Sequence, residues 1–171
     1  MSAVIQDLGR VHFIGLGGAG MSAVARVLLG RSVAVSGSDA ADSRGLQALA
    51  ALGAARTVAG DHRVHVLFQP HLFSRTQEFA KEFAGALSLA DTVRVLDIYA
   101  AREDPVEGVT SRFISDRLTV PGGYAPDADE ALREMVITAQ SGDIILTVGA
   151  GDVTRFGPLL VDLLAGKGHP Q

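Results

Sequence analysis

Short apolar runs alternate with stretches of helical periodicity along almost the whole chain, and this pattern narrows the fold more than any single motif does. It is typical of a parallel sheet whose strands are joined by helices that cover both faces. We therefore expect an α/β fold with a mostly parallel, doubly wound, Rossmann-like sheet. The apolar runs predict strands at Val11–Leu16, Val33–Ser36, Val64–Phe68, Val93–Ile98 and Ile144–Val148.

The stretches between these strands predict helices, and capping residues indicate where some of them begin and end. Ser74 and Gln77 form a capping-box pair at the start of one helix, and Gly53 is expected to end the helix before it. In the last helix, Pro158 is expected in the first turn and Gly166 just past the end. The other helical stretches are Met21–Leu28, Leu46–Ala50, Val109–Leu118 and Ala128–Ala139.

The pattern breaks between Gly60 and Arg63. A weak strand at Arg56–Ala59 leads directly into the strong one at Val64–Phe68, whereas a crossover between parallel neighbours needs a dozen or more residues. We therefore expect that a helical part is missing here, and that the chain divides into residues 1–62 and residues 63–171. The pattern leaves open whether the two segments share one sheet.

Composition excludes several classes of function. The chain has 171 residues, 47% of them apolar, and a formal net charge of -4, as ordinary soluble globular proteins do. Fifteen Lys and Arg against nineteen Asp and Glu, with no Trp, argue against a nucleic-acid partner. The absence of cysteine excludes disulfides and thiolate metal sites. Glycines interrupt the apolar stretch 11–25, so we expect a cytoplasmic protein without a membrane segment.

A glycine-rich loop, Gly15-Leu16-Gly17-Gly18-Ala19-Gly20, follows the first strand and opens the first helix, and Asp39 closes the second strand. Such a loop lets a diphosphate approach the backbone at a helix N-terminus, while an acidic residue accepts from a ribose hydroxyl. Close packing of a strand against a helix would also require glycines. The context favours nucleotide binding, but NAD and a UDP-sugar both present a diphosphate and stay open as ligands.

A second group of polar residues follows the strand Val64–Phe68. His71 is able to donate to an anion or move a proton, and Arg75 is a candidate clamp for a carboxylate or phosphate. Each also has an ordinary interpretation, as a loop histidine and a solvated helix residue. Polar residues follow two further strands, at Asp97–Tyr99 with Arg102 and Glu103, and at Gly149–Asp152. Because ligands bind at the carboxyl ends of strands in open α/β sheets, we expect a shared site there.

Other catalytic machinery is missing from the sequence. The only lysines are Lys81 and Lys167, and neither lies in the Gly-x-x-x-x-Gly-Lys-Ser/Thr pattern that cradles the phosphates of ATP. The remaining histidines lack the spacing of metal ligands, so no metal site is expected.

In chain order, these blocks resemble the Mur ligase family, whose members form amide bonds with ATP during the synthesis of peptidoglycan precursors. Val11–Ser22, Val35–Asp39 and Ser43-Arg44 are similar to its N-terminal, UDP-sugar-binding domain. Five blocks are similar to its C-terminal domain: Phe68–His71, Ser74–Thr76, Asp97–Tyr99, Ala101–Glu103 and Gly149–Thr154. The family's central ATPase domain has no counterpart here, which indicates an internal deletion near His62-Arg63.

The resemblance implies UDP-N-acetylmuramate as the partner and places His71 and Arg75 on the amino-acid and phosphate side. The family uses ATP and Mg²⁺, but no cofactor is expected on this chain and no residue is assigned a catalytic role, because phosphoryl transfer needs the missing domain. We therefore expect no ligase turnover by the chain unaided. The implied UDP-sugar-binding residues are Gly15, Gly17, Gly18, Ala19, Gly20, Met21, Ser38 and Asp39.

Two other interpretations stay open. One interpretation makes the two segments a single compact module that binds NAD or another dinucleotide without catalysis. The other makes them a remnant that binds nothing and whose unpaired sheet edges associate.

Overall fold

The computed structural model describes residues 10–14, 34–38, 52–53 and 55–167. The strands are β1 (Arg10–Ile14), β2 (Ala34–Ser38), β3 (Val64–Gln69), β4 (Thr92–Val95), β5 (Gly122–Tyr124) and β6 (Ile144–Gly149). The helices are α3 (Phe73–Glu78), α4 (Ala80–Leu87), α5 (Arg112–Ser115), α6 (Ala128–Thr138) and α7 (Val153–Lys167). Residues 52–53 and 55–59 are helical as well.

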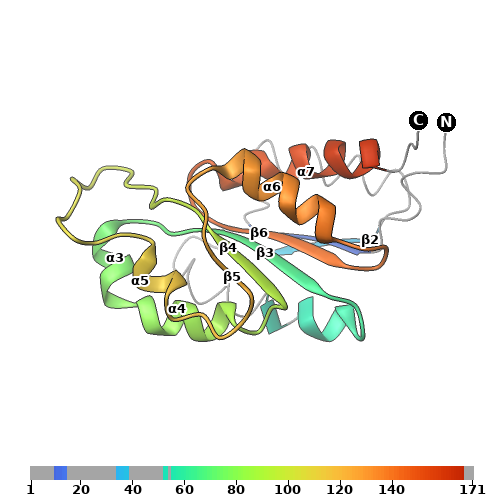
Figure 1. The fold of residues 1–171 in the computed structure, drawn as a ribbon, viewed down its shortest axis with the longest axis horizontal. Coiled ribbons are helices and arrows are strands. Elements are labelled where there is room, and N and C mark those ends of the chain that lie inside the picture. The colour runs from blue at the N-terminus through green and yellow to red at the C-terminus, as the bar shows by residue number, and fades with distance from the viewer. Residues whose placement is uncertain (1–9, 15–33, 39–51, 54, 168–171) are drawn as a thin grey trace.

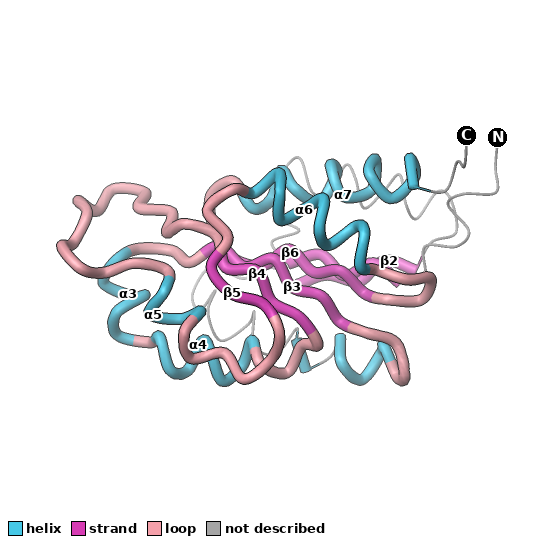
Figure 2. The backbone as a smooth tube through the Cα atoms, viewed as in Figure 1, coloured by secondary structure: helices cyan, strands magenta, loops and turns pink. Residues whose placement is uncertain are grey.

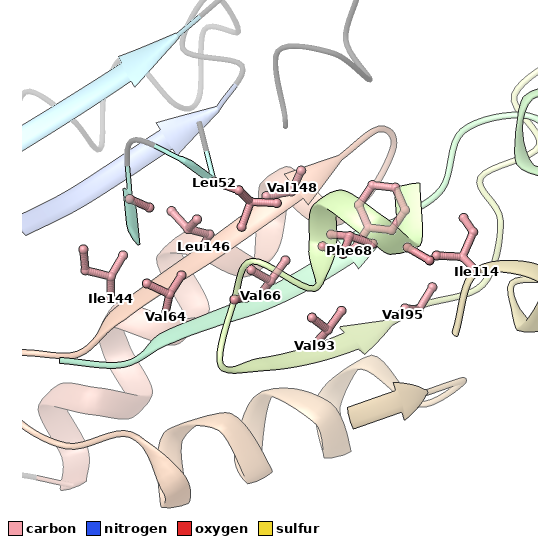
Figure 3. Packing of buried hydrophobic residues seen from close by; sticks show 14 of the residues in the cluster. Leu52, Val64, Val66, Phe68, Val93, Val95, Ile114, Ile144, Leu146 and Val148 are labelled. Carbon is pink, nitrogen blue, oxygen red and sulfur yellow. The ribbon is translucent and has the colours of Figure 1, made fainter. Parts of the chain in front are cut away.

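Both sheets are parallel, and helices cover both faces of the larger one, as the sequence pattern predicts. Four strands pair in the order β5-β4-β3-β6, and β1 pairs with β2, every pair being parallel. The α6 and α7 helices lie on one face, and α3, α4 and α5 lie on the other (Figure 1). The β1 strand lies beside β6, and its arrow points the same way (Figure 3). The expected α/β fold is therefore confirmed.

The central strand β3 is buried along its whole length, which fixes where the core sits. Its residues Val64, Val66 and Phe68 face a cluster shared with β4, β6, α4 and α5 (Figure 3). Leu67 points to the opposite face, where α6 and α7 supply the second cluster. Burial of each such aliphatic or aromatic side chain stabilises the fold by about 1.5–3 kcal/mol, so this strand organises both layers.

The segment before β3 differs from the sequence prediction. Residues 55–59 form a helix and not the weak strand expected at Arg56–Ala59. The β-branched Thr57 and Val58 suggested a strand, but Leu52, Ala55 and Ala59 share one helical face and are buried in the cluster with β3. The weak strand expected at Arg56–Ala59 is therefore wrong, while the missing helical part and the domain boundary at residue 62 stay predictions.

Arg56 fixes this helical segment to the sheet. Its guanidinium donates to Asp91 at 2.5 Å, and to the carbonyl oxygens of Gly60 at 2.5 Å and His62 at 2.6 Å. The same carboxylate oxygen of Asp91 accepts from the backbone N–H of Val64 at 2.7 Å. One acidic side chain thus connects the helical segment to the first residue of β3.

Other elements also differ from the sequence prediction. The helix expected from Ser74 is split into α3 and α4 at Phe79, and Ser74 lies inside α3 instead of capping it. The last helix begins at Val153, so Pro158 is inside it and Gly166 does not lie beyond its end. The short β5 strand, Gly122-Gly123-Tyr124, was not predicted because its glycines lack strand propensity.

A buried polar cluster joins the amino ends of β3, β4 and β6. The His65 ring is fully buried, with Nδ1 2.8 Å from the Thr92 hydroxyl and Nε2 3.1 Å from Asp143. Asp143 also accepts from the backbone N–H groups of Arg63 and Gln140, each at 2.9 Å. Burial alone would raise the pKa of Asp143, but these donors outweigh it and hold the pKa below its ordinary value.

Replacement of Leu52 tests whether the helical segment 52–59 folds with the sheet. Leu52 is 1% exposed, so we expect Leu52→Ala to lower the free energy of unfolding by about 2–5 kcal/mol in a urea titration. Leu89→Ala, at a side chain 50% exposed, is the matched control and should change it by less than about 0.5 kcal/mol. Equal effects of the two substitutions would contradict the packing.

Replacement of Asp143 tests the buried cluster. Because the pKa of Asp143 is lowered in the folded chain, its stabilisation is fully present at neutral pH and is lost as the pH falls through that folded pKa. We expect Asp143→Asn to lower the free energy of unfolding by about 1–3 kcal/mol at pH 7. The free energy of unfolding of this variant should also fall less steeply as the solution is acidified. The exposed Asp104→Asn is the control. If stability falls as steeply at acid pH in the Asp143 variant as in the native chain, the stabilising role of the Asp143 carboxylate is refuted.

Candidate functional site

The candidate site lies at the carboxyl ends of the parallel strands. The chain leaves β3 for β4 and β5 on one side and returns to β6 on the other, so the order of strands reverses between β3 and β6. Ligands bind at such a switch point in open α/β sheets. We use the name strand-end site for the residues that meet there: Gln69, His71, Asp97, Tyr99, Gly149 and Gly151.

Gln69 connects the ends of three elements. Its side-chain oxygen accepts from the backbone N–H of Val153, the first residue of α7, at 3.0 Å. Its amide nitrogen donates to the carbonyl oxygen of Asp97 beyond β4 at 3.5 Å. The sequence analysis includes Gln69 in a family block but predicts no role for it, although one signal was visible: it is the polar residue that ends an apolar strand.

Tyr124 extends this hydrogen-bonded row to the edge strand β5. Its hydroxyl donates to the carboxylate of Asp97, and the guanidinium of Arg112 lies 4.9 Å from the centre of its ring. The hydrogen bond to Asp97, together with burial and the negative charge, raises the pKa of Tyr124 above its ordinary value. Tyr124 therefore stays protonated at neutral pH and acts as a donor. Neither Tyr124 nor Arg112 was predicted from the sequence.

His71 and Tyr99 form the centre of the strand-end site. The backbone N–H of Tyr99 donates to Pro70 at 2.8 Å, and that of Leu72 donates to Tyr99 at 3.1 Å. The two rings are stacked, with centroids 6.1 Å apart and planes 22° apart. The structure thus brings together His71 and Asp97–Tyr99, as predicted from their positions after neighbouring strands.

Two glycines allow the end of β6 and the turn after it to lie close to Gln69 and Tyr99. A Cβ atom at Gly149 would lie 2.0 Å from the carbonyl oxygen of Gln69, and one at Gly151 would lie 2.3 Å from the ring of Tyr99. Both have positive φ, 128° and 70°, which glycine adopts without strain. The predicted turn at Gly149–Asp152 therefore lines the site beside Tyr99.

Arg75 lies on α3, one turn beyond His71 along the chain. Its side chain is exposed, and within the described part of the molecule its guanidinium makes no ion pair or hydrogen bond. Beside it, Ser74 donates its backbone N–H to Glu103 at 3.1 Å and its hydroxyl to the other carboxylate oxygen. These Ser74 bonds lower the pKa of Glu103, so that carboxylate is ionised at neutral pH.

The predicted UDP-sugar residues fall almost entirely outside the described residues. Ser38 is the last residue of β2, whereas Gly15, Gly17, Gly18, Ala19, Gly20, Met21 and Asp39 lie outside the residues that the structure describes. Among the residues it does describe, no three His, Asp or Glu side chains group in a way that could hold a metal ion. None of the described helices has the length and apolarity to span a membrane.

Comparisons with known proteins converge on one family. The family model described as Mur ligase, glutamate ligase domain, matches residues 21–151. A UDP-N-acetylmuramate–L-alanine ligase of Paenarthrobacter aurescens (strain TC1) is 62% identical over 117 residues, covering 68% of this chain and 25% of the relative. A protein of the same name from Cutibacterium acnes is 49% identical over 144 residues, covering 82% of this chain and 31% of the relative.

The match is partial in length and extends to solved structures. The chain spans only about a quarter to a third of the curated relatives it matches. A murein peptide ligase of Psychrobacter arcticus 273-4 superposes with a TM-score of 0.56 at 16% identity, over 74% of this chain and 27% of that one. At this identity, the likeness shows a similar fold and nothing more.

Replacement of Gly151 tests the packing around Tyr99. We expect Gly151→Ala to lose about 1–3 kcal/mol in urea unfolding, because the residue has positive φ and its new methyl group displaces the Tyr99 ring. The ring signals of His71 and Tyr99 should shift in NMR spectra. Gly85→Ala is the control, since nothing lies within 4 Å of its added methyl group. A Gly151 variant as stable as the native chain would rule out this packing.

Proposed function

The chain belongs to the Mur ligase family, and we propose that it binds UDP-N-acetylmuramate as part of a UDP-N-acetylmuramate–L-alanine ligase without turning it over unaided. The observation that carries this proposal is the convergence of His71 and Tyr99 at the strand switch point, within a stretch 62% identical to a ligase of that name. The neighbouring Arg75 adds an exposed cation without a partner among the described residues.

The proposal assigns the two ends of the ligand to two groups of residues. The loop Gly15–Gly20 holds the diphosphate through backbone N–H groups, and Ser38 and Asp39 bind beside it. His71 and Arg75 take the carboxylate end, for which a planar guanidinium offers two parallel hydrogen bonds. The direction of the strands supports this arrangement. β1 and β2 point the same way as β6 (Figure 3), so their last residues, Ile14 and Ser38, lie at the same edge as the strand-end site.

The residues present do not fit ATP and Mg²⁺. The sequence has no phosphate-binding loop with its lysine, and the described residues offer no cluster of three metal-binding side chains. Loss of one preorganised donor alone costs about 2.7–4 kcal/mol of transition-state stabilisation, and lost orientation costs about 7–11 kcal/mol more. We therefore propose binding of the UDP-sugar and no amide-bond formation by this chain alone.

Thermal unfolding with UDP-N-acetylmuramate tests the binding proposal. A ligand at a hundred times its Kd stabilises the native state by about 2.7 kcal/mol, so we expect Tm to rise by several degrees. NAD at the same concentration should leave Tm unchanged. A Gly17→Val variant should lose the response, because its side chain blocks the approach of the diphosphate.

Each other outcome has a defined meaning. A rise in Tm with NAD alone would replace the proposal by a dinucleotide-binding module, which the same glycine loop and doubly wound sheet also suit. An unchanged Tm with both ligands would reject nucleotide binding. Phosphate release that depends on both ATP and L-alanine, and that is absent from the Gly17→Val variant, would refute the lack of turnover.

A further inference from the structure

The helix that carries Arg75 begins without a cap of its own. Leu72 occupies the N-cap position of α3 and supplies no side-chain hydrogen bond. It also adopts φ 68°, a conformation that is strained for a leucine and persists only where surrounding contacts hold it. Something beyond this segment must therefore fix the backbone between His71 and Arg75.

Glu103 supplies that contact from a loop 29 residues away in sequence. One carboxylate oxygen accepts from the backbone N–H of Ser74 at 3.1 Å, and the other accepts from the Ser74 hydroxyl. The N–H that Glu103 binds is one of the donors that the first turn of a helix leaves unpaired. The positive end of the helix dipole also stabilises an anion at this place.

The loop from Tyr99 to Glu103 is attached to the same segment at its other end. Tyr99 exchanges backbone hydrogen bonds with Pro70 and Leu72 and stacks its ring on His71. A tight turn, with Ala101 at φ 52° and the N–H of Glu103 bonded to Ala100 at 2.9 Å, brings Glu103 back toward Ser74. Figure 2 shows this connection, drawn as loop between β4 and α5, beside α3.

We propose that Glu103 is a positioning residue: by binding Ser74 it fixes the 71–75 segment so that His71 and Arg75 meet the carboxylate end of one ligand together. This inference rests on the proposed function, since it concerns the same ligand. It adds a residue that touches no ligand and acts through two that do. Ser74 lies between those two in the chain, so a single contact sets the position of both.

The test measures the affinity for UDP-N-acetylmuramate by calorimetry in single and combined variants. We expect Glu103→Ala to raise Kd roughly three- to tenfold, because supporting contacts hold binding groups in their productive geometry. Glu103→Gln keeps one acceptor for Ser74 and should fall between the native chain and Glu103→Ala. Glu107→Ala, which removes an exposed carboxylate from the same loop, should leave Kd unchanged.

A combined variant separates positioning from a general structural role. In a chain that already carries His71→Ala and Arg75→Ala, Glu103→Ala should have no further effect on Kd, because the residues it acts through are gone. A further loss of affinity there would overturn the inference, and so would an equal effect of Glu107→Ala.

Failure of the proposed function is recognised separately. If the native chain does not bind the UDP-sugar, that proposal fails, and the contact itself is judged by hydrogen exchange at the Ser74 amide. Faster exchange of that amide in Glu103→Ala, with unchanged exchange in Glu107→Ala, supports the fixing of the 71–75 segment by Glu103. Unchanged exchange in Glu103→Ala overturns it.

Discussion

Burial of β3 on both faces is the constraint on which the described structure depends. Its alternate side chains enter two separate hydrophobic clusters, one under α4 and α5 and the other under α6 and α7. A parallel strand in this position has no solvent-facing side, so every residue along it must be apolar or fully hydrogen-bonded. The polar residues of β3, His65 and Gln69, meet this demand at its two ends.

Those two polar ends have different consequences. At the amino end, the fully buried ring of His65 bonds to Thr92 and Asp143, and its role is to join three strands. At the carboxyl end, Gln69 bonds to the first N–H of α7 and to Asp97, next to side chains that are exposed. The hydrogen bonds of these two polar residues thus stabilise the sheet at its amino edge and support a site at its carboxyl edge.

The parts of the fold that were predictable from sequence are those in which local pattern and tertiary burial agree. The strands β3 and β6 and the helix α6 follow from apolar runs and helical periodicity alone. The α/β class and the placement of His71 near Tyr99 followed from the rule that parallel strands end at one edge.

The rest was decided by contacts that a local pattern does not contain. Ala55 and Ala59 pack on the sheet and make a helix where β-branched neighbours suggested a strand. The short strand β5 depends on Gly122, whose Cβ would lie 1.8 Å from the carbonyl oxygen of Val93, and not on strand propensity. The supporting roles of Gln69 and Glu103 were not predicted because their partners are 28 to 84 residues away in sequence.

The relation between the glycine-loop segment and the strand-end site follows from the same geometry. The described strands β1 and β2 lie beyond β6, and β1 adjoins the edge of β6 that β3 does not occupy. An uncovered strand edge attracts other chains, so a neighbour at this place protects β6. Because the added strands also run parallel to β6 (Figure 3), their carboxyl ends extend the row of strand ends that begins at Tyr124. A ligand that extends along this row would contact both groups of residues.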